Sequence, residues 1–256
     1  NIDSVGLITA RNGIEIGARP GVAASISVDG NMIVSGITTL GTTSFTADAT
    51  VNGVTIGKGA NSASGNTVLG VTALDANTTG TLNTAIGENS LTSNTTGIRN
   101  TAVGRESLYT NSTGGNNTAI GMNAMNANTT GGYNVAVGSL ALDANTTASD
   151  NTAVGYDAAG AITTGDLNVA VGKGAMGSNT VGDRNVAIGA NALYSYNPSS
   201  NEDGYNVAIG LNALNVTTTG NNNTAVGGKA LEANTTGVQN TAVGAFALDA
   251  NTTASY

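Results

Sequence analysis

The stretch NTAVGGKALEANTTGVQ, residues 223–239, decides the fold because close copies of it fill most of the chain. Its leading phrase, Asn-[Thr/Val]-[Ala/Val]-[Val/Ile/Leu]-Gly, recurs every 17 residues, with a single interval of 21. Self-similarity at a fixed period indicates a repeat architecture in which neighbouring units stack on one another. The phrase begins at Asn66, Asn83, Asn100, Asn117, Asn134, Asn151, Asn168, Asn185, Asn206, Asn223 and Asn240.

The residue types within each repeat favour strands over helices. Glycine occupies the fifth position of every unit and usually the fifteenth, and Val, Ile and Thr occur within the leading phrase. Glycine weakens helices, whereas β-branched residues suit a pleated, half-buried surface. We therefore predict an all-β fold in which each repeat is one coil of a β-solenoid, with neighbouring coils about 4.8 Å apart.

The chain divides into two regions. Residues 1–65 lack the repeat and are predicted to form an N-terminal β-rich fibre segment, because GLITARNGIEIG (6–17), ASISVDGNMIVSGITTLGTTSF (24–45) and ATVNGVTIG (49–57) are β-branched runs broken by turn residues. Residues 66–256 hold eleven coils, and a four-residue insertion within 194–205 is predicted to be an external loop. Another repeat would begin at residue 257, so we expect the natural polypeptide to continue.

Several columns of identical residues are expected to form ladders through the stack. We predict that the aliphatic fourth position and the Leu or Met at the ninth position point inward, with Ala at the third and eighth positions allowing close approach. The Asn at position one and the Asn-Thr-Thr of positions twelve to fourteen can hydrogen-bond to their own copies above and below. The predicted ladder residues are Asn83, Ile86, Gly87, Leu91, Asn100, Val103, Gly104 and Leu108.

Composition excludes several classes of function. The net charge of −8 would repel a nucleic-acid backbone, and no apolar run approaches the length of about 20 residues that spans a bilayer. Histidine and cysteine are absent, and the acids form no distinctive cluster, so we predict no metal site, no cofactor and no enzymatic activity. Gly172, Gly174 and Gly177 match GxGxxG, but no helix pattern follows, and we interpret them as part of the repeat.

The insertion is the candidate binding loop. It brings Tyr194, Tyr196 and Tyr205 near Asn201, Glu202 and Asp203 in sequence. Tyrosine is a common anchor in recognition surfaces, including those for carbohydrates. We therefore predict a receptor-binding loop whose partner is a glycan or a protein of a host-cell surface.

The sequence resembles the shaft region of bacteriophage tail-fibre proteins, notably those of marine phages. The similarity is carried by ATVNGVTIGKGANSASGNTVLG (49–70) and ALDANTTGTLNTAIG (73–87), and it covers residues 50–256. It implies a homotrimeric β-structured shaft located in the virion, where it supports host attachment. In that family an intramolecular chaperone domain often follows the shaft, and this sequence contains no such domain.

Two other interpretations stay open. The repeats are also similar to those in the heads of trimeric autotransporter adhesins, which implies an extracellular or bacterial cell-surface location; this chain lacks the heptads of the stalk found in that family. The Thr-Thr columns suggest a monomeric ice-binding solenoid. Adjacent strand residues point to opposite faces, so these columns would present only one threonine row to ice.

Overall fold

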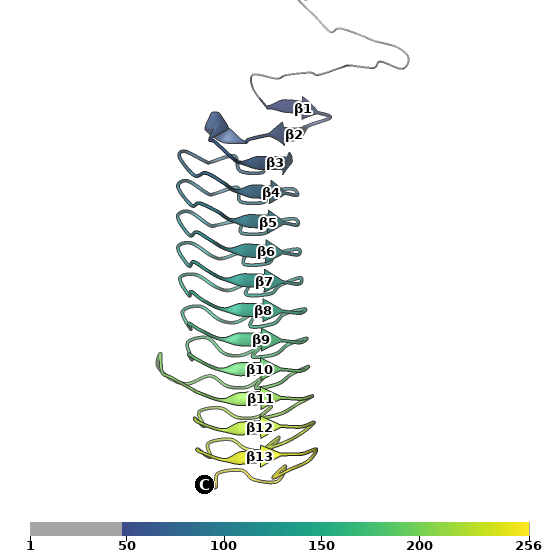
Figure 1. Ribbon diagram of the computed structural model, residues 1–256, viewed down its shortest axis with the longest axis vertical. Coiled ribbons are helices and arrows are strands. Elements are labelled where there is room, and N and C mark those ends of the chain that lie inside the picture. Colours follow the sequence, from purple (N-terminus) through teal and green to yellow (C-terminus); the bar gives the residue numbers. More distant parts are fainter. Residues whose placement is uncertain (1–47, 256) are drawn as a thin grey trace, which may run out of the picture. The chain divides into compact units, whose positions relative to one another are not determined.

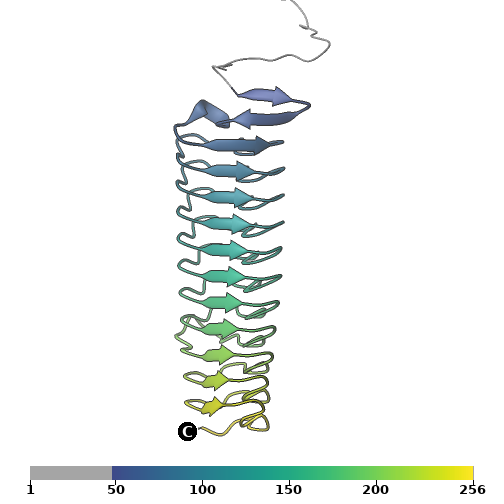
Figure 2. The ribbon, with the colours of Figure 1, turned by 45° about the vertical axis from the view of Figure 1, so that its right-hand side comes forward.

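The computed structural model describes residues 48–255, which form a single stack of coils along one sheet (Figures 1 and 2). The sheet has thirteen strands in sequence order, and η1 (Ala60–Ser62) is a single 3₁₀ turn. The strands are β1 (Ala49–Val51), β2 (Val54–Gly57), β3 (Thr67–Gly70), β4 (Thr84–Ile86), β5 (Thr101–Val103), β6 (Thr118–Ile120), β7 (Val135–Val137), β8 (Thr152–Val154), β9 (Val169–Val171), β10 (Val186–Ile188), β11 (Val207–Ile209), β12 (Thr224–Val226) and β13 (Thr241–Val243). The predicted all-β solenoid with 17-residue coils is thus confirmed.

The N-terminal end of the stack is a hairpin. β1 and β2 pair antiparallel, and β2 pairs antiparallel with β3. The connecting residues Asn52 and Gly53 both have positive φ, as a two-residue hairpin turn requires. The strands predicted within 49–57 are therefore confirmed, whereas the runs at 6–17 and 24–45 lie outside the described residues.

From β3 to β13 the strands pair in parallel and in strict register, so that each residue lies beside its own copy in the next coil. The four-residue insertion leaves this register unchanged, because Val186 still pairs with Val207. Each coil contributes only one strand, of four residues in β3 and three in β4 to β13. The rest of the coil is held by backbone hydrogen bonds to the next coil, such as Leu108 N–H to Ala124 O at 3.0 Å.

Residues in the left-handed backbone conformation explain why each coil has only one strand. Positions seven, nine and seventeen have positive φ throughout the stack, for example 58° at Asn89, 51° at Leu91 and 56° at Arg99. Such a conformation costs a non-glycine residue about 1–2 kcal/mol. Each one bends the chain, and the ninth residue still turns its side chain inward, where Leu91 is fully buried.

The interior is small and partly polar. Ala119, Ala124 and Met125, from positions three, eight and nine of one coil, are completely buried. Two buried asparagines complete the same coil: Asn117 at position one and Asn128 at position twelve. The predicted inward placement of Leu91 and Leu108 and of the small alanines is therefore confirmed.

The asparagine ladders satisfy carbonyl groups that turn inward. The side-chain amides of Asn117 and Asn128 both donate to the backbone oxygen of Gly131, at 2.8 and 3.1 Å. Asn128 also donates to the Oδ1 atom of Asn111 at 2.7 Å, and the Asn117 N–H donates to Asn100 Oδ1 at 3.0 Å. An amide is both donor and acceptor, so the same residue can continue the chain of bonds in every coil. This confirms the predicted ladder roles of Asn83 and Asn100.

The fourth position was predicted to point inward, and this prediction is wrong. Side chains alternate along a strand, so the buried alanine at position three places positions two and four on the outer face. Ile86 and Val103 are accordingly half-buried, and Ile120 is 40% exposed. The larger aliphatic residues are outside because the thin interior has room only for alanine there.

The fifth-position glycines fit against one another from coil to coil, as expected for Gly87 and Gly104. Gly121 has a φ of 140°, and a Cβ atom added to it would lie 2.5 Å from the carbonyl oxygen of Gly138. Backbone cannot move aside as a side chain can. Only glycine therefore fits this column.

We expect Gly121→Ala to lower the free energy of unfolding by about 2–4 kcal/mol, through left-handed strain and backbone overlap. Gly228→Ala is the matched control, since a Cβ atom there would meet no atom within 4 Å. Thermal unfolding followed by circular dichroism measures both variants. Equal melting temperatures for the two variants would contradict this account of the glycine column.

Candidate functional site

One long side of the stack carries two rows of outward side chains, which we call the outer aliphatic face. It consists of the residues at repeat positions two and four, which lie in the strands β3 to β13. All of them are Thr, Val, Ile or Leu. Neither row contains a charged residue. At the last strand, where no further coil flanks it, Val243 is 71% exposed. The face therefore offers a continuous uncharged surface along the sheet.

The insertion loop does not bring its three tyrosines together. Tyr196 takes the place of the position-twelve asparagine and is fully buried, where its hydroxyl donates to Asn221 Oδ1 at 3.0 Å. Burial is the main cause that raises the pKa of its phenol, followed by the nearby carboxylates of Glu202, Asp183 and Asp203. The prediction that Tyr196 contacts a receptor is therefore wrong; its ring is part of the core.

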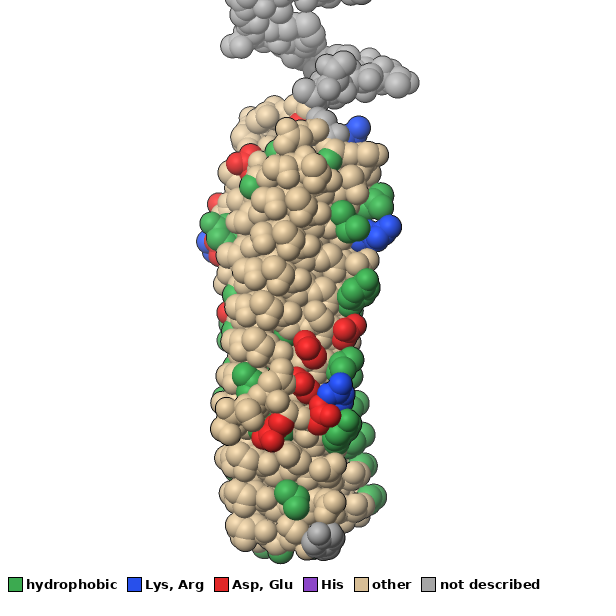
Figure 3. Space-filling model, turned by 90° about the vertical axis from the view of Figure 1, so that its left-hand side faces the viewer, with side chains coloured by type: hydrophobic (Ala, Val, Ile, Leu, Met, Phe, Trp, Pro, Cys, Tyr) green, Lys and Arg blue, Asp and Glu red, His purple; other side chains and the backbone are tan. Residues whose placement is uncertain are grey.

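Tyr205 lies in a charged cluster on the surface. Its hydroxyl donates to Asp203 Oδ2 at 2.9 Å, and the guanidinium of Arg184 pairs with the other oxygen of the same carboxylate. Asp183 Oδ1 accepts a hydrogen bond from the backbone N–H of Asp166 at 2.7 Å. Figure 3 shows acidic side chains gathered on one face of the lower half of the stack, with a basic side chain among them.

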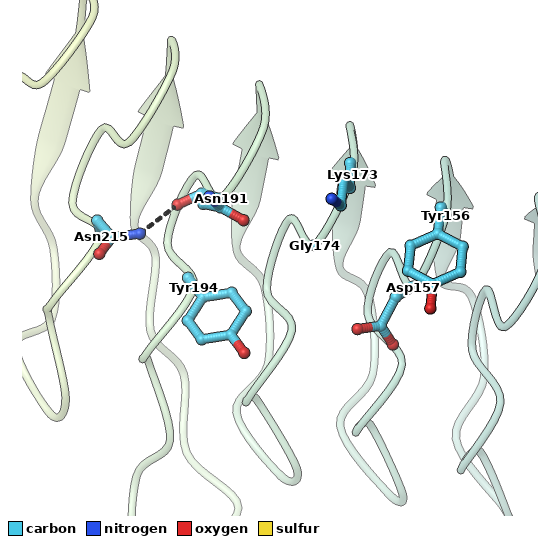
Figure 4. Close-up of a pocket in the computed structure, with 7 residues that line it drawn as sticks. All are labelled: Tyr156, Asp157, Lys173, Gly174, Asn191, Tyr194 and Asn215. Carbon is cyan, nitrogen blue, oxygen red and sulfur yellow. Dashed lines mark hydrogen bonds between the residues drawn. The ribbon is translucent and has the colours of Figure 1, made fainter.

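Tyr194 faces a different feature, a surface pocket of about 430 Å³ that spans four coils. We call it the Tyr156–Tyr194 pocket, after its two aromatic walls. In Figure 4 the Tyr194 ring and the Asp157 carboxylate lie on either side of the Gly174 backbone, and Tyr156 stands beside Asp157. The lining residues are Tyr156, Asp157, Lys173, Gly174, Asn191, Tyr194 and Asn215.

Glycines at variable positions create the hollow. Position ten is glycine in two successive coils, at Gly160 and Gly177, and Gly174 occupies position seven between them. A Cβ atom on Gly177 would lie 2.6 Å from the Tyr194 ring, so the ring rests directly on this backbone. The Asp157 carboxylate lies over Gly160 in the same way.

Asp157 lines the pocket, and its carboxyl and that of Asp143 in the preceding coil both have shifted pKa values. Burial raises the pKa of Asp157, and burial together with the charge of Asp157 raises the pKa of Asp143. A folded-state pKa above the unfolded one means that folding favours the protonated form. The stability that these groups contribute is therefore fully present at acidic pH and is lost as pH rises through their folded pKa values.

Most of this pocket was not predicted from the sequence, which singled out only Tyr194. The available signal was departure from the repeat: consecutive glycines at position ten, and tyrosines at Tyr156 and Tyr194 where neighbouring coils have other residues. Of the glycines in the GxGxxG match, Gly174 lines the pocket and Gly177 lies beneath the Tyr194 ring, and neither begins a helix.

Across residues 48–255, no three His, Cys, Asp or Glu side chains are grouped so as to hold a metal ion. The helical content of that range is a single short turn, and no helix there is long and apolar enough to cross a membrane.

Comparison with known proteins adds no family to these observations. No family model, no curated protein and no solved structure matches the chain. The resemblance to phage tail-fibre shafts therefore stays a prediction from the repeat sequence.

Proposed function

We propose that this chain is a shaft segment of a phage tail fibre or a related virion appendage, in which three copies associate along their length. The observation that supports this most strongly is the placement of residues by size. From β4 to β13 the inward residue of each strand is alanine, while the larger Thr, Val and Ile residues of the same strands lie on the outer aliphatic face. Position four is Leu, Val or Ile in every coil, and a contiguous apolar row on a surface marks an interaction site.

A second copy of the same chain is the partner that fits this face. Its side chains recur at the coil spacing of about 4.8 Å over eleven parallel strands, so a parallel copy presents the same spacing. The rows carry no charge, and contact between identical copies therefore brings no like charges together along them. Three copies is the number that the resemblance to tail-fibre shafts implies.

Association would also compensate for the thin core. The coils of Leu91 and Leu108 each bury only that one large aliphatic side chain, beside one alanine, one serine and two asparagines. Covering positions two and four would add apolar burial at about 25 cal/mol per Å² of surface removed from water. The fibre then gains length from stacking along the chain and stability from contact between chains.

Native mass by light scattering tests the association. We expect about 75 kDa, three times the 25.0 kDa chain, which is the mass of a closed oligomer with threefold symmetry. Ile120→Lys should shift the mass toward that of the monomer, because it places a charge in the outer aliphatic face. Thr130→Lys, on an exposed position of the same coil, is the matched control and should leave the mass unchanged. A wild-type mass near 25 kDa would overturn the proposed trimer.

Immunogold electron microscopy tests the location. An antibody against residues 66–256 should label the tail appendages of virus particles purified from the source. Label on bacterial cell surfaces instead would support an adhesin head. Label on neither would overturn both assignments.

A further inference from the structure

We propose that the Tyr156–Tyr194 pocket binds one sugar unit of an uncharged oligosaccharide. This goes beyond a shaft function, because it assigns the side of the stack a ligand-binding role of its own. The inference rests on the pocket's size, its aromatic walls and its set of polar groups.

The size and walls suit a sugar ring. A volume of about 430 Å³ lies within the range of small-molecule sites. Tyr194 is 39% exposed and Tyr156 is 53% exposed, so both rings are available to a ligand. They belong to coils two apart, which separates them by about 10 Å along the stack. A sugar ring has apolar C–H faces that stack on aromatic rings, and the hydroxyl of each tyrosine adds a hydrogen-bonding group.

The floor is held in place by its fit to the neighbouring coils. The Tyr194 ring rests on Gly177, and Asn191 Oδ1 would lie 2.9 Å from a Cβ atom on Gly174. Gly174 has a φ of 63°, which is part of the left-handed pattern of position seven. A ligand would therefore meet a surface that stacking has already ordered, which reduces the entropy lost on binding.

The polar groups match vicinal hydroxyls. Asp157 supplies a carboxylate acceptor, Lys173 an ammonium donor, and Asn191 and Asn215 supply amides that donate and accept. The Asn215 amide already donates to the backbone oxygen of Asn191 at 3.0 Å, which fixes its orientation (Figure 4). Burial raises the pKa of Asp157, and a partly desolvated carboxylate forms strong hydrogen bonds to hydroxyl donors.

The charges favour a neutral ligand over an anion. Asp157 and Lys173 together contribute no net charge, and the chain as a whole carries −8. A phosphate or a nucleotide would meet one ammonium group beside a carboxylate. An entirely apolar ligand would leave the amides and charged groups without partners, at a cost in free energy. A hydroxyl-rich, uncharged molecule brings no net charge and also gives hydrogen-bond partners to the amides and the charged groups.

Saturation-transfer difference NMR with maltotriose, chitotriose, mannotriose and lactose tests the proposal on the intact chain. We expect at least one of these sugars to bind. Tyr194→Ala and Asp157→Asn should each weaken that binding by about tenfold or more, as loss of an anchor residue does. Tyr109→Ala is the matched control, because Tyr109 is an exposed tyrosine at the same repeat position outside the pocket.

Binding of none of the four sugars would overturn the proposal. Equal binding by wild type and both pocket variants would also overturn it, since the sugar would then lie elsewhere. Circular dichroism of each variant separates loss of binding from loss of fold. The measurement is independent of native mass, so a failed trimer and a failed sugar site give different results.

Discussion

In-register stacking is the constraint on which the rest of this structure depends. Once every residue lies beside its own copy, a side chain is acceptable only if it interacts well with itself at the coil spacing. Asparagine meets this condition because its amide donates to one neighbour and accepts from the other, and glycine meets it where backbones touch. The same condition limits charge. The carboxylates of Asp166 and Asp183, from neighbouring coils, each accept a backbone N–H, yet burial and the charge of Asp166 still raise the pKa of Asp183 despite the nearby Arg184.

Stacking also explains the division between inside and outside. A coil of 17 residues encloses little space, and the inward carbonyls of position fifteen need donors, so asparagine and alanine take much of the interior. The larger β-branched residues then lie on the outer face of the strand. The outer aliphatic face is thus a product of the thin core, which links the geometry of one coil to the proposed association of several chains.

Much of the fold could be predicted from the sequence because the repeat is regular. Its period predicts the length of one coil, and the recurring glycines and asparagines predict which residues stack on their own copies. The direction of position four could not be inferred from hydrophobicity, because the aliphatic Ile120 points out and the smaller Ala119 points in. The burial of Tyr196 could not be inferred from its residue type. It follows from the repeat position, because position twelve points inward. The pocket could not be predicted because it is formed by side chains from four coils, and in the sequence it is visible only as departures from the repeat.

Thiol labelling of cysteine variants tests most directly whether other copies cover the outer aliphatic face. The chain has no cysteine, so Ile120→Cys and Thr130→Cys each introduce a single thiol in the same coil. In one isolated chain both positions are exposed. The account predicts that the thiol at position 120 reacts much more slowly than the thiol at position 130 in the native protein, and equally fast after unfolding. Equal rates in the native protein would contradict it, because the face would then be open to water.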